Sequence, residues 1–358
     1  MEKVTIKDVA QLAGVSIATV SRVVNKQGSV APQFVEKVNS AIQELNWHPN
    51  SAAQNLKNSK SRTVGLLLPN TADPFFGSIA ESVITSCTEH ALNVLTFISR
   101  VESGYDDVAK FRRLAEAGVD GVIYCSINRP DLVAFERYLA NIPAVICSRR
   151  DLIPGRPHVY FNHQKGGYLA TRHLLEMGHR KIALFVGAFG KDFQNAGDLQ
   201  QYLDSPLLAG PYSGIDKYIG ARRALDEYSV PFDPNLLEFI DLGNAYESGY
   251  NAMQRLLSRT TNVDAVFCTN DFSANGVICM LSQQRISVPD DISVIGYDNG
   301  IMSTCTQPQL STVMQDTHIL GQQCVICLDK LLNNEPCEDV EIDVKLIIRQ
   351  SSCRKQHA

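Results

Sequence analysis

Residues 16–25 combine side chains that can read DNA bases with side chains that can hold the phosphate backbone. Arg22 can donate two hydrogen bonds to a guanine, and Ile17 and Ala18 can contact a thymine methyl group. Hydroxyl and amide side chains suit phosphate contacts, which position a protein without specifying a sequence. We predict a DNA-binding surface that includes Thr5, Ser16, Ile17, Ala18, Thr19, Ser21, Arg22 and Asn25.

Two short helices with a tight turn between them are needed to present these side chains. Thr5 with Asp8 three residues later is typical of a helix start, and Ser16 with Thr19 repeats the arrangement. Gly14 lies where the chain has to turn. The apolar residues then fall on inward faces, which are formed by Val9, Leu12 and Ala13 in the first helix and by Val20, Val23 and Val24 in the second. This pattern predicts a helix-turn-helix that reads DNA.

A third helix and a polar connector complete the N-terminal region. Pro32 suits the first turn of a helix that ends near Leu45, so residues 1–49 form a small three-helix head. Residues 47–62 are mostly polar, with one helix-competent patch at about 50–57. Because isolated helices of this length are marginal in water, we expect the patch to order only with support from DNA or a partner chain.

The distribution of charge agrees with a DNA-binding head. The whole chain of 358 residues has a formal net charge of -5, which by itself does not indicate a nucleic-acid partner. Residues 1–62, however, hold eight Lys and Arg against four acids, a charge of +4, which leaves -9 on the remainder. A basic head on an acidic body directs the head to phosphates. The alternative is a solvated helical domain with an ordinary charge imbalance.

The body from Thr63 onward alternates apolar runs with helical patterns, which predicts an α/β fold with parallel sheets. Its roughly 295 residues exceed a comfortable single core, so we expect two lobes. The predicted strands are Val64 to Pro69, Asn93 to Ile98, Gly121 to Cys125, Ala144 to Ser148, Lys181 to Val186, Leu236 to Asp241, Ala265 to Cys268 and Ile292 to Gly296.

From the head through the connector and nearly to the C-terminus, the chain resembles the lactose/galactose repressor (LacI/GalR) family of bacterial transcription regulators. The run from Val15 to Val23 is similar to the galactose-repressor version of the DNA-reading helix. The resemblance implies that residues 50–62 are a hinge helix and linker, in which Leu56 enters the minor groove with Ala53 beside it. A stray exposed leucine is the alternative for Leu56.

The resemblance also implies the organisation of the body. It places an effector-binding core of the periplasmic sugar-binding type at residues 63–345, followed by a C-terminal tail at 346–358. It assigns the first lobe to about 63–161 and 292–321 and the second to about 162–291 and 322–345, with three crossovers between them. A ligand is then expected in the cleft, at loops that follow the carboxyl ends of the strands.

Cleft candidates are the polar and aromatic side chains at these loop positions. The effector-binding set that the resemblance implies is Phe75, Phe76, Ser126, Arg149, Phe161, Lys217, Asn244, Asn270, Asp271 and Asp298. Aromatic faces beside hydrogen-bonding groups suit sugar or base rings. Asp298 is the strongest polar candidate. For Asp271 we favour a cap of the following helix over a ligand contact.

The chain departs from the family at three cleft positions and in one loop. Lys217 stands where many relatives have an arginine, Phe161 where an aspartate is common and Asn244 where several have an aromatic ring. The segment from Gly187 to Lys217 is also roughly twenty residues longer than expected. Long loops in compact domains are often functional. We hypothesise that residues 188–212 cover the cleft and reshape the effector site, with a plain solvent loop as the alternative.

The other residues that could do chemistry form no coherent set. The ten cysteines occur without a signal peptide, which favours a cytoplasmic, reduced protein, and Cys324 and Cys327 form a lone CxxC without a second pair. No catalytic arrangement or cofactor fingerprint occurs, so we expect no enzyme activity, cofactor or metal. An enzyme with a DNA-binding head and a transport-type binding protein remain as rival classes.

These observations together predict a homodimeric repressor that binds operator DNA under the control of a small molecule. Each chain reads one half-site of a near-palindromic operator. A sugar or glycoside is the preferred effector, and a purine or nucleoside is the alternative. The sequence does not choose between an inducer and a corepressor. The C-terminal tail is too short for the heptad bundle of tetrameric relatives, so a dimer is expected.

Overall fold

The computed structural model describes the chain as two compact units, residues 1–62 and 63–358. No helix in the described part of the chain is long and apolar enough to cross a membrane. The described residues are 4–25, 29–47, 61–99, 107–126, 131–150, 153–188, 193, 195–204 and 212–354.

Three helices form the first unit: α1 (Ile6–Ala13), α2 (Ile17–Val24) and α3 (Pro32–Glu44). Their inward faces make a small core from Val9, Ala10, Ala13, Val20, Val38, Ala41 and Trp47. Leu12 does not belong to it, because its side chain is 46% exposed and not on the inward face that we expected. The third helix ends at the predicted place.

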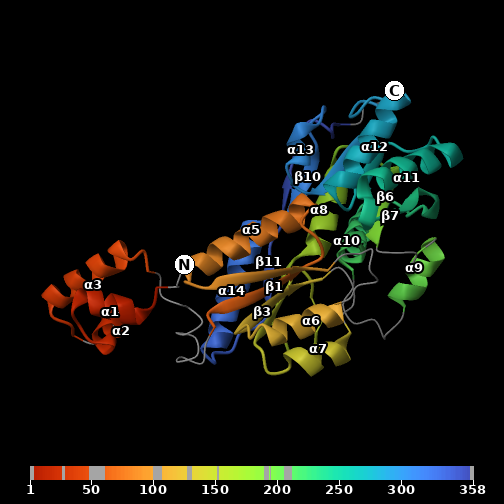
Figure 1. The fold of residues 1–358 in the computed structure, drawn as a ribbon. Coiled ribbons are helices and arrows are strands. Elements are labelled where there is room, and N and C mark those ends of the chain that lie inside the picture. Colours follow the sequence, from red (N-terminus) through yellow and green to blue (C-terminus); the bar gives the residue numbers. More distant parts are fainter. Residues whose placement is uncertain are drawn as a thin grey trace. The chain divides into compact units, whose positions relative to one another are not determined.

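The second unit contains two six-stranded sheets (Figure 1). The first has the order β11-β5-β4-β3-β1-β2 and is parallel throughout. Its strands are β1 (Thr63–Leu68), β2 (Asn93–Ile98), β3 (Gly121–Cys125), β4 (Ala144–Cys147), β5 (His158–Phe161) and β11 (Val340–Ile342). We call this sheet and its helices the first lobe.

The second sheet has the order β12-β10-β9-β8-β6-β7, and only β12 runs antiparallel to its neighbour. Its strands are β6 (Ile182–Ala188), β7 (Leu237–Asp241), β8 (Ala265–Cys268), β9 (Ser293–Asp298), β10 (Ser311–Met314) and β12 (Lys345–Ile347). This sheet and its helices form the second lobe, and the α/β fold with two parallel-sheet lobes agrees with the prediction.

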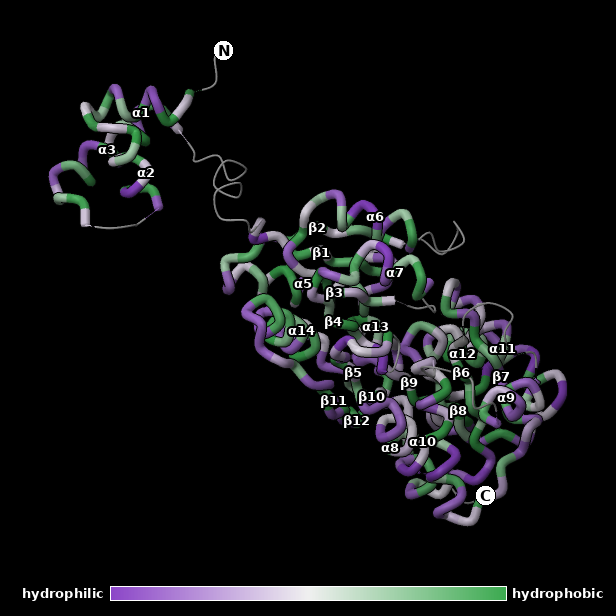
Figure 2. Tube along the Cα trace, turned by 90° about the horizontal axis from the view of Figure 1, so that it is seen from below, coloured by the Kyte–Doolittle hydropathy of each residue, from purple (hydrophilic) through white to green (hydrophobic). Residues whose placement is uncertain are grey.

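Helices cover both faces of each sheet, so consecutive strand residues are buried on opposite sides. In β1, Leu66 and Leu68 join one core and Leu67 joins another. Figure 2 shows the hydrophobic residues concentrated along the strands. The first lobe carries α5 (Pro74–Glu89) and α14 (Thr317–Leu332) on one face and α6 (Asp107–Glu116) and α7 (Leu132–Leu139) on the other.

The second lobe is layered in the same way. One face carries α8 (His163–Glu176) and α10 (Ser213–Glu227), and the other carries α11 (Ala245–Arg259) and α12 (Asp271–Gln283). The short helices α9 (Ala196–Leu203) and α13 (Met302–Cys305) follow β6 and β9, respectively. The single turns η2 (Pro234–Leu236) and η3 (Leu242–Asn244) lie directly before and after β7.

The expected division of the C-terminal third between the lobes is wrong. Strands β9 and β10 pair with the second sheet, although we assigned 292–321 to the first lobe. Most of 322–345 lies in the first lobe, because α14 packs on α5 and β11 pairs with β5. The chain therefore passes between the lobes after β5, after β10 and between β11 and β12. Hydrophobic periodicity shows that a strand is buried but not which sheet accepts it.

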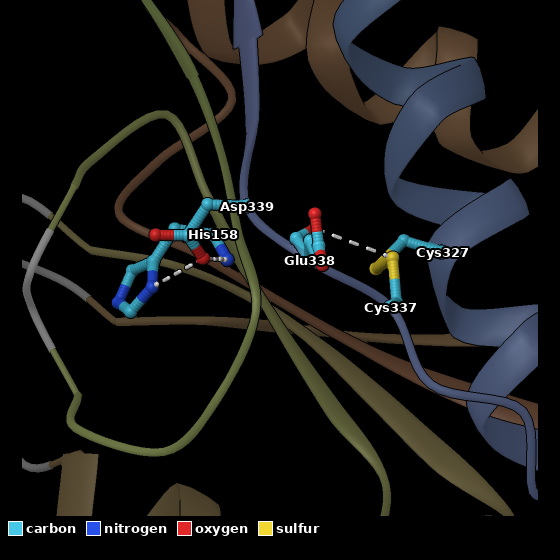
Figure 3. The surroundings of a disulfide bond; sticks show 5 residues. All are labelled: His158, Cys327, Cys337, Glu338 and Asp339. Atoms are coloured by element: carbon cyan, nitrogen blue, oxygen red, sulfur yellow. Dashed lines mark hydrogen bonds and ion pairs between the residues drawn. A yellow bond between two sulfur atoms is a disulfide. The ribbon is translucent and has the colours of Figure 1, made fainter.

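A disulfide joins Cys327 of α14 to Cys337, shortly before β11 (Figure 3). This bond departs from the expectation of reduced thiols throughout. Next to it, Asp339 Oδ1 accepts a hydrogen bond of 2.7 Å from the backbone N–H of His158 and lies 3.3 Å from Nδ1 of the same residue. The disulfide therefore ties α14 to the segment that leads into the edge strand β11, after which the chain makes its last crossover. Cys324 remains a buried free thiol.

Candidate DNA-reading helix and effector cleft

Local hydrogen bonds define the starts of both helices in the helix-turn-helix. Asp8 Oδ2 accepts from the backbone N–H and the hydroxyl of Thr5, both at 2.7 Å, and these bonds lower the pKa of the Asp8 carboxyl. Ser16 Oγ accepts from the backbone N–H of Thr19 at 3.1 Å. Gly14 has a φ of 64°, in the left-handed region that favours glycine. The predicted caps and turn are therefore present.

The second helix presents its predicted reading side chains to solvent. Ile17 is 45% exposed, and Ala18 and Arg22 are also exposed. Among the predicted phosphate-contacting residues, Thr5, Ser16 and Asn25 are exposed while Thr19 and Ser21 are half-buried. An isoleucine with this exposure on a helix of a stable head is available for an apolar contact. Two predicted DNA contacts, Ala53 and Leu56, and most of the connector lie outside the described residues.

A cavity of about 400 Å³ lies where strand ends of both lobes meet. The first lobe contributes residues that follow β1, β3 and β4, and the second contributes residues that follow β6, β7, β8 and β9. Cavities of this size between α/β lobes are typical of small-molecule sites. Its polar and aromatic lining residues are Asn70, Asp73, Phe75, Phe76, Ser126, Ser148, Arg149, His163, Tyr212, Ser213, Lys217, Asn244, Tyr246, Thr269, Asn270, Phe272, Asp298 and Gln315.

The structure brings most of the predicted cleft residues together in this cavity. Its lining includes Phe75, Phe76, Ser126, Arg149, Lys217, Asn244, Asn270 and Asp298. Phe161 is not among them, because its ring is buried in the core beside His163, with ring centroids 6.2 Å apart. Asp271 also lies outside the lining and does not cap α12 as we expected.

Asn270 takes the capping role, since its side chain accepts from the backbone N–H of Ser273 at 2.7 Å. Asp271 instead holds the chain that follows β9. Its carboxylate accepts from the backbone N–H of Gly300 at 3.0 Å and from the hydroxyl of Thr312 at 2.6 Å. Burial raises the pKa of Asp271 to about 7. Asp271 therefore supports the cleft from behind, one residue away from the cavity wall.

Lys217 is a buried cation in the wall of the cleft. Its ammonium group donates to the carbonyl of Thr269 at 2.8 Å and lies 3.8 Å from the ring centre of Tyr297. Burial lowers the pKa of Lys217 to about 8, although the nearby carboxylates, Asp298 first, oppose the shift. The lysine presents a compact charge with three donors here, where an arginine would present a planar fork, so the contact differs from the one expected in many relatives.

Asp298 faces Lys217 from the end of β9. Burial raises the pKa of its carboxyl well above the usual range, and Lys217 only partly offsets this effect. Oδ1 accepts from the side chain of Gln315 at 2.6 Å. Both Asp298, with a φ of 118°, and Ser148, with a φ of 69°, have backbone conformations that are rare outside glycine. Such conformations concentrate at ligand-binding sites.

His163 and Gln315, which line the cavity, each have one buried polar atom without a hydrogen-bond partner among the described residues. These atoms are Nε2 of His163 and Oε1 of Gln315, and both side chains are more than nine-tenths buried. Burial and the charge of Lys217 hold the pKa of His163 well below its usual value, so its ring is neutral. Buried polar atoms of this kind commonly await a ligand or water.

Sequence reasoning missed several of the lining side chains. Asn70 and Asp73 lie between β1 and α5, and this position after a predicted strand could have identified them. Gln315 follows β10, a strand that was not predicted. His163 had no such signal because the strand it follows, β5, was not itself predicted, and Tyr212 had none because it ends the long insertion. Across the described residues, no cluster of three or more His, Cys, Asp or Glu side chains could hold a metal ion.

Comparisons with known proteins account for both units. Residues 5–50 match the bacterial regulatory proteins of the lacI family, residues 61–190 match the periplasmic binding proteins and sugar binding domain of LacI family, and residues 171–352 match a periplasmic binding protein-like domain. Over 97% of its length the chain is 32% identical to the transcriptional repressor PurR of Haemophilus influenzae strain PittEE, of which it covers 98%. The chain belongs to the LacI family.

Other relatives agree with this LacI-family assignment. PurR of Vibrio atlanticus is 33% identical over 92% of this chain and 93% of that protein. The lac repressor dimer bound to operator and the anti-inducer ONPF matches with a TM-score of 0.84 and 27% identity, over 98% of this chain and all of that one. The regulator CelR in complex with cellobiose matches with a TM-score of 0.69 and 29% identity over the same shares.

The head and the cleft now have a common explanation. The protein is a DNA-binding transcriptional repressor of the LacI family, controlled by a small molecule, and it is not an enzyme. Its helix-turn-helix is the DNA-binding part, and its two lobes are the regulatory part.

Proposed function

We propose that the protein acts as a homodimer whose two heads read half-sites of a near-palindromic operator, and that a sugar or glycoside in the cleft sets its affinity for that operator. The lac repressor relative is a dimer on its operator, which supports the proposed assembly. Because the operator belongs to the chromosome, the proposal places the protein in the cytoplasm. The domain boundaries of the proposal are a head at 1–49, a hinge and linker at 50–62 and an effector-binding core from 63. The expected end of the core at 345 is too early, because β12 pairs with β10 and Ser351 is hydrogen-bonded to Val294.

In the proposed complex, the second helix of the head lies in the major groove. Arg22 contacts a guanine there, and Ile17 and Ala18 contact thymine methyl groups. The exposed faces of these three side chains support this role. Thr5, Ser16, Thr19, Ser21 and Asn25 hold phosphates. Ser16 with Thr19 and Ser21 with Asn25 are already hydrogen-bonded in pairs, so little ordering is needed on binding.

One observation on the cleft supports a sugar or glycoside as the effector. Hydrogen-bonding side chains from both lobes surround the cavity, while Phe75, Phe76 and Tyr246 supply aromatic surface. A sugar ring presents hydroxyl groups around its edge and apolar C–H faces, so it needs this combination. The hydrogen-bonding groups proposed for it are Ser126, Arg149, Lys217, Asn244, Asn270 and Asp298.

A purine or nucleoside is the second candidate, because the relatives that match over nearly the whole chain are the PurR repressors. A flat base can also use the aromatic surface of the cleft. In either case the effector acts by differential affinity for two arrangements of the lobes. An effector that favours the DNA-binding arrangement is a corepressor, and one that favours the other arrangement is an inducer.

The two effector classes separate in a thermal-shift screen with cellobiose, methyl glycosides, inosine and guanine, since a ligand of the folded state raises its melting temperature. We expect a glycoside to raise it. Asp298→Asn should abolish this shift, whereas Asp226→Asn, a matched change of an exposed carboxyl on α10, should retain it. A shift with inosine or guanine alone would replace the sugar proposal by the second candidate. A glycoside shift that survives in Asp298→Asn would place the ligand outside this cleft.

A further inference from the structure

A ladder of aromatic rings connects the long insertion after β6 with the effector cleft. The ladder begins on the second sheet, where Phe193 stacks on Phe239 of β7 with ring centroids 5.5 Å apart and an interplanar angle of 26°. Tyr202 of α9 meets Phe193 edge-on at 5.1 Å. Tyr212, which lines the cleft, stacks on Tyr202 at 6.2 Å and 28°. Helix α9 is thus held to the lobe by one ring contact and supports a cleft residue by another.

Arg149 lies on the ring of Tyr212. This arginine follows β4 in the first lobe, and its guanidinium carbon is 5.2 Å from the Tyr212 ring centre. Both residues line the cleft, and Arg149 is only 6% exposed. The contact therefore joins the first lobe to the residue that precedes α10 of the second lobe.

The neighbouring arginine strengthens the same cross-cleft connection. Arg150 donates to both carboxylate oxygens of Asp216 in the first turn of α10, at 2.8 and 3.2 Å. Asp216 also accepts from the side chain of Gln164 at 2.9 Å. A bidentate pair of this kind fixes direction as well as distance. The pair fixes the position of the chain after β4 relative to the start of α10, and Arg149 and Tyr212 lie close to its two members along the chain.

We propose that α9 is a positioning element of the effector site, which fixes the Arg149 guanidinium in the cleft wall through Tyr202 and Tyr212. There Arg149 binds two oxygens of the effector, such as adjacent hydroxyls or a carboxylate. This proposal rests on the proposed function, because it assumes that the cleft holds the effector. An arginine fixed beforehand loses less side-chain freedom when the effector binds, so the rings of the insertion increase affinity without touching the ligand.

The ring of Tyr202 matters in this account, and its hydroxyl does not. The Tyr202 hydroxyl is buried and has no hydrogen-bond partner among the described residues. Tyr202→Phe should therefore preserve the positioning of Arg149, and Tyr202→Leu should lose it. Both variants lack the hydroxyl and are apolar, and only Tyr202→Phe keeps the ring, which makes them a suitable pair.

The chain offers a matched control in the first lobe. There the Arg156 guanidinium lies over the ring of Phe135 at 5.7 Å, at a site remote from the cleft lining. Phe135→Leu removes the ring beneath Arg156, whereas Tyr202→Leu removes the ring that supports Tyr212 beneath Arg149. Phe135→Leu does not alter the insertion. A general loosening of the fold would affect both arginines in both variants.

Reactivity of the arginines towards phenylglyoxal, mapped by peptide mass spectrometry on the full chain, tests the positioning directly. We expect Tyr202→Leu to speed modification of Arg149 roughly fivefold, because Tyr212 loses the ring that holds it against the guanidinium and the cation–π contact weakens, and to leave Arg156 unchanged. Phe135→Leu should leave the Arg149 rate unchanged, and Arg156 stays held by its hydrogen bonds to the carbonyls of Leu139, Ala140 and Ile142. Tyr202→Phe should match the wild type. An Arg149 rate that is the same in Tyr202→Leu and in the wild type would overturn the proposal.

Binding of cellobiose, isopropyl thiogalactoside and inosine to the same variants tests the effector half. We expect Tyr202→Leu to lower the affinity roughly tenfold for whichever probe the wild type binds, and Tyr202→Phe to leave that affinity unchanged. Unchanged affinity together with a faster Arg149 reaction would contradict a role in effector binding. If the wild type bound none of the sugar or nucleoside probes, the proposed function would fail by itself, while the arginine rates would still decide whether α9 positions Arg149.

Discussion

Arg22 is the single residue whose loss should most clearly separate specific from nonspecific DNA binding. A guanine contact contributes about 1–3 kcal/mol of discrimination, whereas a phosphate contact weakens all DNA equally. We expect Arg22→Ala to reduce affinity for a selected operator by this amount and to change affinity for random DNA much less. Fluorescence anisotropy on both DNAs measures the difference. Lys37→Ala, an exposed cation on α3, is the control, and equal losses on both DNAs in Arg22→Ala would contradict base reading.

His163 gives the effector cleft a defined response to acid. Its folded pKa lies well below the ordinary value of 6.5 because of burial and Lys217. Below pH 6.5 the unfolded chain therefore binds a proton that the folded chain does not, so stability falls as the pH decreases, by at most about 1.4 kcal/mol per pH unit for this group.

We expect His163→Gln to show a smaller loss of unfolding free energy between pH 7 and 5.5 than the wild type, as measured by urea denaturation. His90→Gln, at an exposed position, is the control and should follow the wild type. NMR should find that the His163 ring titrates below the ordinary value of 6.5. A ring that titrates near pH 6.5 would show that its environment is not the buried one described here.

At the level of residues, the sequence predicted the cleft better than it predicted individual roles. Phe75, Asn270 and Asp298 lie on the cavity because parallel strands bring their carboxyl ends to one edge. The prediction that Phe161 lines the cleft was wrong, because the direction of a side chain at a strand end depends on local register. The prediction that Asp271 caps the following helix was wrong. Either of two adjacent polar residues, Asn270 or Asp271, can cap a helix, and only the structure shows that Asn270 does so.

Among the elements, α8 and α10 depend on glycines for their close approach. A Cβ at Gly220 would lie 1.8 Å from the carbonyl oxygen of Gln164, and one at Gly167 would lie 1.8 Å from that of Lys217. We expect Gly220→Ala to cost about 3 kcal/mol of unfolding free energy, because two backbones would have to separate. Chemical denaturation checks this value.

Gly77→Ala is the matched control for that substitution. Its Cβ would meet only the carbonyl of Thr71 at 3.6 Å, an ordinary contact, and alanine favours a helix by about 0.5–1 kcal/mol over glycine. The control should therefore be neutral or slightly stabilising. Similar losses in both variants would show that the α8 and α10 backbones do not touch in this way.

The disulfide between Cys327 and Cys337 is a second element-scale feature with a measurable consequence. It closes a loop with a sequence separation of 10, so its removal should lower the unfolding free energy by about 2–3 kcal/mol. We expect a reductant to destabilise the wild type and to leave the Cys327→Ser/Cys337→Ser double variant unchanged. Cys305→Ser, at an exposed thiol, should behave as the wild type does. Equal sensitivity of wild type and double variant would contradict the bond.

The elements themselves were predictable where they are long or fully buried. Residues 93–98 and 121–125 form the predicted strands to the residue. The four strands that were missed, β5, β10, β11 and β12, have three or four residues each and include polar side chains. By contrast β4 and β8, also four residues long, are wholly apolar and were predicted. The caps at Thr5 and Ser16 were recognisable because capping is a local interaction.

For the regulatory unit as a whole, the sequence indicated two lobes but did not show which late strands and helices belong to which lobe. Short strands that return late in the chain, such as β10 and β11, choose their sheet by long-range packing. Their exchange places α14, with the disulfide, in the first lobe and β9, with Asp298, in the second. Motion between the lobes would therefore move Asp298 and Arg150 relative to each other, which is how a ligand in the cleft can influence the whole molecule.

The most direct test of the central claim is the affinity of the full-length protein for an operator selected from random DNA, measured by anisotropy with and without a saturating cleft ligand. The account predicts that the ligand found by thermal shift changes the operator Kd by at least about tenfold in the wild type. It also predicts no change in Asp298→Asn, whose Kd without ligand should equal that of the wild type. An operator Kd that stays the same in the wild type, although the ligand raises its melting temperature, would contradict control of DNA binding from this cleft.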